Sequence, residues 1–375
     1  MNWKCWKNET VGVIKRVEAV DLFRFLVLFF MIQGHLFRAY LLPAIRQAHW
    51  YLVHETLHGM VAPGFLFVSG FAAFLSFHNK RQNYIHLDRA FFKRLRRIMF
   101  VIAIGYWIHL PFFSLRKTLW QISQGQAGEF LKTDILQCIG VGLLLFTIIA
   151  VILKNEKIVV LFSLLAGVLF FLLPETVKHI HLHPAVDPYF NTDISLFPIF
   201  PWAGFLFLGV IVAYVYSLLK KEIFFRLLLV VGVAIFPWFF LHSAQGYFKA
   251  ELTLGGNLNK AGGVFIVLWF ADLLLRKFKG PLLSVLIKAG TESLFVYVLH
   301  LFIIFNSIFG FGLNRYFHDS MNVGQALLFF FILQALVFAL SYFYNWLKEK
   351  HPPAWRVVFY GFWIVFILVF VVRPN

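Results

Sequence analysis

Residues 19–40 read AVDLFRFLVLFFMIQGHLFRAY, an apolar stretch long enough to cross a membrane as one helix. Comparable stretches follow along the whole chain. The predicted spans are 20–41, 57–77, 95–113, 134–153, 157–173, 196–218, 224–241, 261–276, 282–305, 323–346 and 355–373. Pro111 and Pro237 interrupt two of them, so that either could be re-entrant. The sequence therefore predicts an all-α integral membrane protein of about 10–11 transmembrane helices in one bundle, with a cytoplasmic tail over 1–19 and a membrane domain over 20–373.

The composition supports a lipid environment. Of 375 residues, 61% are hydrophobic and 14% are charged, whereas soluble domains are roughly 45–50% apolar and about 25% charged. The net charge of +17 lies in short loops and not on one basic face, so we do not expect a nucleic-acid partner. Membrane lipid with anionic head groups, or an anionic cofactor, explains the charge better.

The distribution of Lys and Arg predicts the orientation. With the N-terminus in the cytoplasm, 23 of these residues fall in inside segments and 10 in outside segments. This asymmetry predicts a multi-pass protein of the plasma (inner) membrane, with the N-terminus inside and the 174–195 loop outside.

The first predicted helix carries charged side chains within a membrane-spanning stretch, where burying a charge is energetically costly. Such charges are typical of a functional site. Asp21 and Arg24 are three residues apart and share a helix face, and Arg24 and His35, eleven apart, also align. The face thus predicts a charged pair near the cytoplasmic side and an imidazole toward the far side. A plain alternative is an interfacial ion pair and an interfacial histidine.

A second cluster is RAFFKRLRRIMF, which holds Arg94, Arg96 and Arg97 at the cytoplasmic end of the third span. Anchoring by the positive-inside rule accounts for much of it. Arginine forks also suit phosphate groups, so we keep a phosphate site as the functional interpretation.

Two further stretches contain candidate polar residues. KAGTESLFVYVLHLFII places Ser293, Tyr297 and His300 on one helix face behind Glu292, where capping and interhelical hydrogen bonds are the alternatives. HWYLVHETLHG crowds histidines, His49 and His54 among them, at the outer end of the second span, where an interfacial run is the alternative. Small residues in the same span predict close helix packing.

Alternating histidines in KHIHLHP (His179, His181 and His183) are weak candidates for metal ligands. They lack cysteine partners and a helical spacing of four. We therefore predict no metal.

The motifs resemble those of a known superfamily. RVEAVDLFRFLVLFFMIQGH, with an arginine, ten residues and a histidine (Arg24 to His35), resembles the first helix of type-3 membrane acyltransferases. The RLR at 94–96 is similar to their paired-arginine motif, and SLFVYVLH to their late helix ending in histidine. PGFLFVSG, DILQCIGVGLLL and FPIFPWAGFLFLGV resemble successive helices of the heparan-α-glucosaminide N-acetyltransferase-like branch.

The resemblance implies an acyltransferase that moves an acyl group, usually acetyl from acetyl-coenzyme A, to a hydroxyl or amine of a sugar or glycan across the membrane. On this interpretation Arg94, Arg96 and Arg97 hold the phosphates of the donor, and Arg24, oriented by Asp21, lies near the path of the pantetheine arm. For catalysis the resemblance implies His35, as in the wider superfamily, or a histidine in the loop after the first helix, as in the glucosaminide branch.

In this chain that loop offers His49 or His54, and the sequence leaves the choice open, with His35 preferred. Two other classes remain as alternatives, a multi-helix transporter or flippase and a non-catalytic membrane scaffold.

Overall fold

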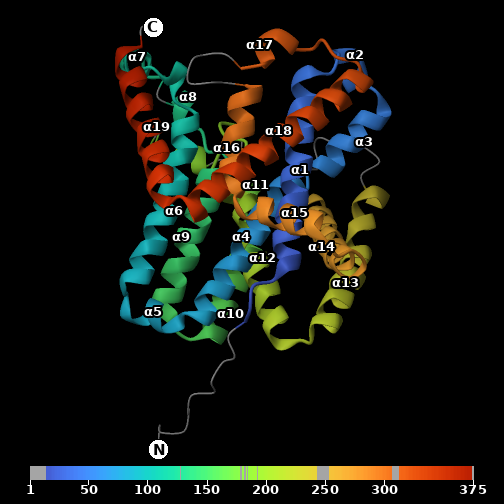
Figure 1. Ribbon diagram of the computed structural model, residues 1–375. Helices are drawn as coiled ribbons and strands as arrows, with labels where there is room; N and C mark the ends of the chain where they lie inside the picture. The colour runs from blue at the N-terminus through green and yellow to red at the C-terminus, as the bar shows by residue number, and fades with distance from the viewer. Residues whose placement is uncertain are drawn as a thin grey trace, which may run out of the picture.

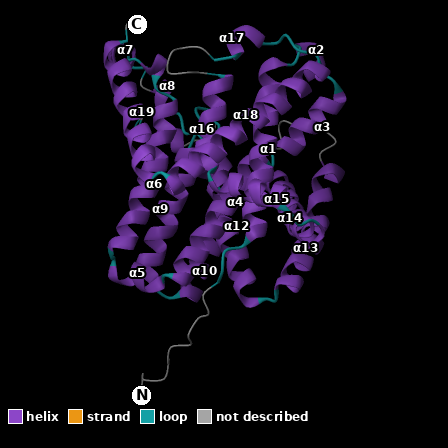
Figure 2. Cartoon of the chain, viewed as in Figure 1, coloured by secondary structure: helices purple, strands orange, loops and turns teal. Residues whose placement is uncertain are grey.

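The computed structural model describes residues 14–126, 128–177, 180, 183, 185–191, 193–242, 253–305 and 312–373. Across these ranges the regular structure is helical and contains no strand (Figure 2), with one isolated bridge between Leu41 and Met321. The prediction of an all-α bundle is confirmed.

The long helices form the bundle seen in Figure 1. They are α1 (Glu18–Tyr40), α4 (Val61–Asn79), α6 (Arg89–Ile108), α9 (Ile135–Leu153), α10 (Glu156–Leu172), α12 (Ile199–Leu218), α13 (Lys221–His242), α14 (Leu254–Lys277), α18 (Val323–Lys350) and α19 (Pro352–Val372). The short ones are α2 (Pro43–Arg46), α3 (His49–His58), α5 (Arg81–His86), α7 (Leu115–Ser123), α8 (Gly128–Leu131), α11 (Pro174–Val177), α15 (Pro281–Thr291), α16 (Ser293–Ile304) and α17 (Asn314–Phe317), with 3₁₀ turns at Pro111–Phe113 and Asp187–Tyr189.

Seven helical segments of the described chain are long and apolar enough to cross a membrane, or eight if the bent pair α15–α16 counts as one span. One of them joins α3 and α4. The other predicted spans coincide with α6, α10 and α13. Of these, α10 has only 17 residues, and α6 begins with five Lys and Arg in nine residues.

The first helix lies at the centre of the bundle. α1 packs against α4, α14, α15, α16 and α18, and most of its residues are buried. By contrast, α19 buries only Phe366 among its described residues, so its large apolar surface faces the surroundings. Such exposure is what lipid requires and water penalises.

Small residues allow α4 and α12 to pack closely, as the sequence predicts. A Cβ on Gly70 of α4 would lie 1.8 Å from the Leu206 carbonyl oxygen of α12. In return, a Cβ on Gly209 would lie 1.9 Å from the carbonyl oxygen of Phe67. Only glycine fits at these two positions, so the two backbones touch directly.

Polar contacts join the helix ends at the lower end of the bundle in Figure 1, where α5 and the start of α10 lie. The Ile14 N–H, just before α1, donates to Oδ1 of Asn79 at the end of α4 (2.9 Å). Nδ1 of His78 lies 2.9 Å from Oε2 of Glu156, the first residue of α10. These contacts bring together segments that the charge distribution predicts on one side.

The opposite end holds α2, α7, α17 and the end of α19. Arg46 of α2 pairs with Asp319, which follows α17. The Ser114 hydroxyl, before α7, donates to the Arg373 carbonyl after α19 (3.1 Å). The start of α1 and the end of α19 thus lie at opposite ends of the bundle.

Three sequence predictions of local structure need correction. The span predicted over 95–113 is α6, which begins six residues earlier because Asp88 caps it, its side chain accepting from the Ala90 and Phe91 N–H groups. It ends before Pro111, which starts a 3₁₀ turn. The histidine-rich stretch before α4, predicted as a loop, is the helix α3, whose last turn is closed by the Gly59 N–H on the Glu55 carbonyl.

The third correction concerns the span predicted over 282–305, which is broken. α15 and α16 meet at a bend of 83°. Glu292 leaves the helical conformation there, and its carboxylate pairs with Lys348 of α18 (2.9 Å). Gly290 lies so close to α1 that a Cβ would be 2.2 Å from the Asp21 carbonyl oxygen, so α15 ends directly on the α1 backbone.

Candidate functional site

Four imidazole rings from three helices gather around the second half of α1. The His35 ring of α1 lies between that of His300 on α16 and that of His58 on α3, at centroid distances of 5.1 and 6.5 Å. His54 stacks on His58 at 6.1 Å. We call these four residues the histidine cluster.

The local sequence explains how the rings meet. His54 and His58 are four residues apart on α3, so they project from one face. Gly34 makes room for His58 on α1, because a Cβ there would lie 1.8 Å from Nε2 of His58. His35 is the next residue along, so the gap left by Gly34 brings the α3 imidazole beside the α1 imidazole.

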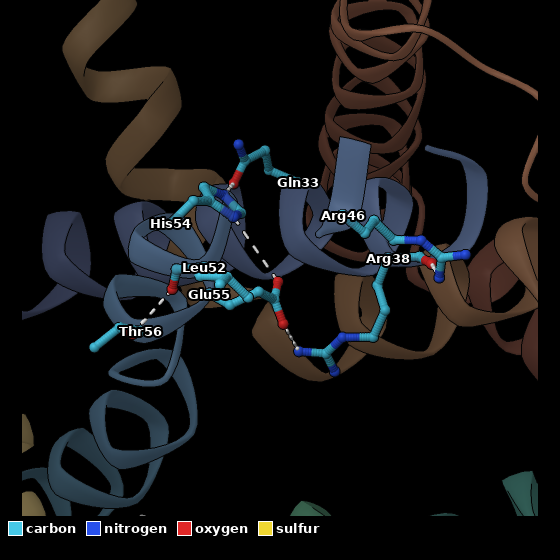
Figure 3. A network of polar contacts seen from close by, with 7 residues as sticks. All are labelled: Gln33, Arg38, Arg46, Leu52, His54, Glu55 and Thr56. Atoms are coloured by element: carbon cyan, nitrogen blue, oxygen red, sulfur yellow. Dashed lines mark hydrogen bonds and ion pairs between the residues drawn. The ribbon is translucent and has the colours of Figure 1, made fainter. Parts of the chain in front are cut away.

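A polar network holds His54 (Figure 3). Nε2 of His54 lies 2.7 Å from Oε1 of Gln33, and Nδ1 lies 3.8 Å from Oε1 of Glu55. Glu55 also accepts a hydrogen bond from Arg38 (2.6 Å), and Arg46 donates to the Arg38 carbonyl (2.8 Å). With Nε2 donating to the Gln33 oxygen, an additional proton on Nδ1 would be attracted by the Glu55 carboxylate.

Each ring of the cluster keeps a buried nitrogen that has no hydrogen-bond partner in the described part of the chain. These atoms are Nδ1 of His35, Nδ1 of His54, Nε2 of His58 and Nε2 of His300. In His300, Nδ1 lies 3.0 Å from the Val296 carbonyl and so carries the hydrogen, which leaves a lone pair on Nε2. Buried polar atoms of this kind are normally satisfied, so the cluster is suited to receive a polar ligand or a proton.

A second polar group continues from the cluster across the bundle. The Tyr297 ring lies 5.6 Å from that of His300, and its hydroxyl donates to Oδ2 of Asp134 (2.7 Å). The same carboxylate oxygen lies 3.5 Å from Nε2 of His109. Asp134 also caps α9. Together, rings and carboxylate connect His35 to His109, at the end of α6.

The predicted pair at the start of α1 is present. Oδ1 of Asp21 accepts from Arg24 at 2.8 Å, and Oδ2 accepts from Arg16 at 2.5 Å. The Asp21 side chain is 5% exposed and that of Arg24 is 22% exposed. The carboxylate is thus fully engaged by two guanidinium groups.

The predicted arginines of α6 differ in their surroundings. Arg94 is half-buried, with its guanidinium carbon 5.4 Å from the centre of the Tyr84 ring. Arg96 and Arg97 are exposed. α6 packs mainly on α9 and α5, whereas α1 packs mainly on other helices. The arginines of α6 and Arg24 of α1 therefore lie on helices that do not pack extensively against each other.

The remaining predicted residues fall into two groups. His300 and Tyr297 join the cluster and its extension, as described. Glu292 sits at the α15–α16 bend with Lys348, Ser293 begins α16, and His49 is the exposed first residue of α3, so these three lie apart from the cluster's contacts.

No group of three or more metal-ligating side chains occurs among the residues that the structure places. His179 and His181 of the alternating-histidine motif lie outside these residues.

The chain matches the family model described as heparan-alpha-glucosaminide N-acetyltransferase, catalytic, over residues 16–244. The chain belongs to this family. A comparison with curated proteins found no match. The glucosaminide N-acetyltransferase segment contains α1 and α3, hence His35, His54 and His58, and it also contains Asp134. His300 and Tyr297 come from the part of the chain beyond it.

Sequence reasoning missed several members of the site. Asp134 starts an apolar run and reads as a helix cap, which it is, but its contact with Tyr297 spans 163 positions of sequence. The sequence around His109 and Gln33 contains no spacing or motif that marks either residue as part of a site. A signal was available for Arg38, a charge inside an apolar helix, whose partner Glu55 follows at the outer end of the next span.

Proposed function

We propose that this protein is a transmembrane acyltransferase. It takes an acyl group, acetyl in the simplest case, from a cytoplasmic acyl-coenzyme A and passes it to a hydroxyl or amine of a sugar or glycan on the outer side. The N-terminus lies in the cytoplasm. The family supports the transferase chemistry, and the 23-to-10 distribution of Lys and Arg supports the orientation.

His35 acts as the general base. It removes the proton from the acceptor oxygen or nitrogen as that atom attacks the thioester carbon. The new C–O or C–N bond forms, the C–S bond breaks, and the proton passes from His35 to the leaving sulfur, which departs as the free thiol. Transient transfer of the acyl group to the imidazole is the covalent variant of the same step.

One observation carries this assignment. The His35 ring stands between two other imidazoles and its buried Nδ1 lacks a partner in the described chain. His54 also keeps an unpartnered Nδ1, but its Nε2 is bound to Gln33 and the ring faces the Glu55 carboxylate. A residue that must accept a proton from a substrate needs a free lone pair directed into the site. His54, and the more exposed His49, are the alternatives that the glucosaminide branch implies.

On the donor side, Arg96 and Arg97 hold phosphates at the cytoplasmic face, with Arg94 stacked behind them on Tyr84. Arg24, held by Asp21, lies near the path of the pantetheine arm. The reaction needs no metal.

The test uses purified protein in vesicles with radiolabelled acetyl-coenzyme A on one side and glucosamine on the other. Label in the sugar supports the proposal. A transporter or flippase, or a scaffold, would leave the sugar unlabelled, and a protein that also fails to bind the donor would contradict the proposal outright.

The orientation has its own test. Val186, exposed in the 174–195 loop, and Lys157, exposed at the start of α10, are each changed to Cys in a Cys5→Ser background, where Cys138 is fully buried. In intact cells an impermeant maleimide should label Val186→Cys and spare Lys157→Cys. The reverse pattern would invert the direction of transfer.

A further inference from the structure

A cavity of about 250 Å³ opens beside the histidine cluster. It is bounded by α1, by α3 and the start of α4, and by α14. Its polar lining is confined to Gln33, His54 and His58, and the rest is apolar. A dry apolar cavity of roughly 150 Å³ can already hold benzene, so this space accommodates a larger hydrocarbon group.

The lining of the cavity extends along α1, which contributes Phe23, Val27, Phe30 and Gln33. Its lining includes Gln33 at one end and Phe23 at the other. Ten residues of helix separate these two positions, which is about 15 Å at 1.5 Å per residue. Val27 and Val264 line the space between, so a chain lying in it would touch hydrocarbon along most of its length.

One wall of the cavity belongs to the lipid-facing surface. Phe30 and Leu57 line the cavity and are 47% and 43% exposed. In a membrane, large apolar side chains of this kind face hydrocarbon. A molecule dissolved in the bilayer therefore reaches the cavity sideways, between α1 and α3, without crossing water.

We infer that the cavity binds the hydrocarbon chain of a membrane lipid whose hydroxyl or amine, borne by its head, is the acyl acceptor. The chain lies along α1 toward Phe23, and the head lies at Gln33, His54 and His58, beside His35. This rests on the proposed function and specifies its acceptor as lipid-linked. Gln33, His54 and His58 give this end of the cavity the polar side chains that such a head group needs.

A water-soluble acceptor would leave this geometry unexplained. It would require polar groups around its whole outline, whereas the cavity offers them at one end only.

The probe for binding is a hexadecanol carrying a diazirine in mid-chain, added to phosphatidylcholine vesicles that contain the full-length protein. Illumination should attach it to peptides of α1, the α3–α4 junction and α14. Excess unmodified hexadecanol should suppress the labelling.

Two variants fill the cavity, Val267→Phe on α14 and Val61→Phe at the start of α4. Each should lower the labelling about tenfold or more, because displacing a few methylene groups from an apolar site costs that much affinity. Val168→Phe on α10, which is 46% exposed and away from the cavity, is the matched control and should label like the unaltered protein. Equal labelling of filled and unfilled proteins overturns the inference. Labelling that coenzyme A displaces also overturns it, since the donor arm would then occupy the cavity.

A second readout separates this inference from the proposed function. Acetyl-coenzyme A is added, and the acetyl ester of hexadecanol and the free thiol are measured. Cavity-specific labelling without formation of the acetyl ester would support lipid binding in the cavity and contradict acyl transfer to the bound lipid. The opposite result is that the cavity-filling variants still acetylate soluble glucosamine and that hexadecanol labelling is not specific to the cavity. It would support the proposed transferase activity and contradict the lipid acceptor.

Discussion

The two halves of α1 treat their polar groups in opposite ways. At its start, both oxygens of the Asp21 carboxylate are engaged by guanidinium groups, from Arg24 and Arg16. In its second half, His35 meets two further imidazoles, and each ring retains a buried nitrogen without a partner in the described chain. Removing one partner of a completed buried ion pair destabilises a fold, whereas buried nitrogens without partners can still bind a proton or a ligand.

The difference teaches where to look for chemistry along one helix. Charge alone draws attention to Asp21 and Arg24, yet their mutual pairing leaves little capacity for a ligand. The histidines are neutral by default and less conspicuous, but their lone pairs are available. We therefore expect substitutions at the two ends to differ in kind, one affecting reaction rate and the other stability.

The largest effect is expected at His35. His35→Ala should lower the rate of transfer by about 10²–10⁴-fold, the usual loss with a general base, and leave donor binding near normal. Transfer and binding of radiolabelled acetyl-coenzyme A measure the two separately. His54→Ala and His49→Ala should cost less. If His35→Ala keeps nearly full activity while His54→Ala or His49→Ala abolishes transfer, the inactivated histidine of α3 is the general base.

The opposite end of α1 should respond through stability. Asp21→Asn leaves Arg24 without its buried partner, which costs about 3–5 kcal/mol for pairs of this kind. Thermal unfolding in detergent should show a lower midpoint, and the folded fraction should still transfer acetyl groups. Unchanged stability combined with a large rise in the KM for the donor would instead show that Asp21 and Arg24 bind the donor directly and are not a structural pair beside its path.

The arginines of α6 should affect the donor alone. Changing Arg96 and Arg97 together to Ala should weaken acetyl-coenzyme A binding by about 100-fold or more, since each charge-assisted hydrogen bond contributes at least roughly 1.5 kcal/mol and about 1.4 kcal/mol is tenfold in affinity. Lys93→Ala removes an exposed charge from the same turns of α6 and serves as the control. An equal loss of donor affinity in Lys93→Ala and in the double variant would indicate that the basic cluster only anchors α6 at the membrane surface.

Gly34 offers a finer test of the cluster's geometry. Gly34→Ala pushes a methyl group against Nε2 of His58, and overpacking of this kind costs about 1–3 kcal/mol. Unfolding and transfer should both suffer. Adding His58→Ala should restore stability, because the clash disappears.

Gly361→Ala on α19 is the matched control for Gly34→Ala, since its added methyl group meets nothing within 4 Å. If Gly34→Ala behaves like this control, the close approach of α3 to α1 is wrong.

The sequence predicted the parts of this molecule that depend on local composition. Apolar length revealed the spans, and spacing on one helix revealed the Asp21–Arg24 pair and the shared face of Tyr297 and His300. What it missed depends on contacts between helices. Gly290, next to the bend at Glu292, lies against α1, and Asp134 accepts a hydrogen bond from a tyrosine 163 residues away. Neither contact produces a periodic pattern in the sequence, so neither could be predicted from it.

The bridge between Leu41 and Met321 has a consequence for how the chain can be divided. The Met321 N–H donates to the Tyr40 carbonyl (2.8 Å), and the Leu42 N–H donates to the Met321 carbonyl (3.0 Å), so the end of α1 is bound to the segment that precedes α18. Residues 16–244 carry the family match, but His300, beside His35, arrives from outside it. Cutting the gene after codon 244 would give two fragments, each with part of the histidine cluster. Activity would return only through complementation, when both are produced in one cell and reassociate across this bridge.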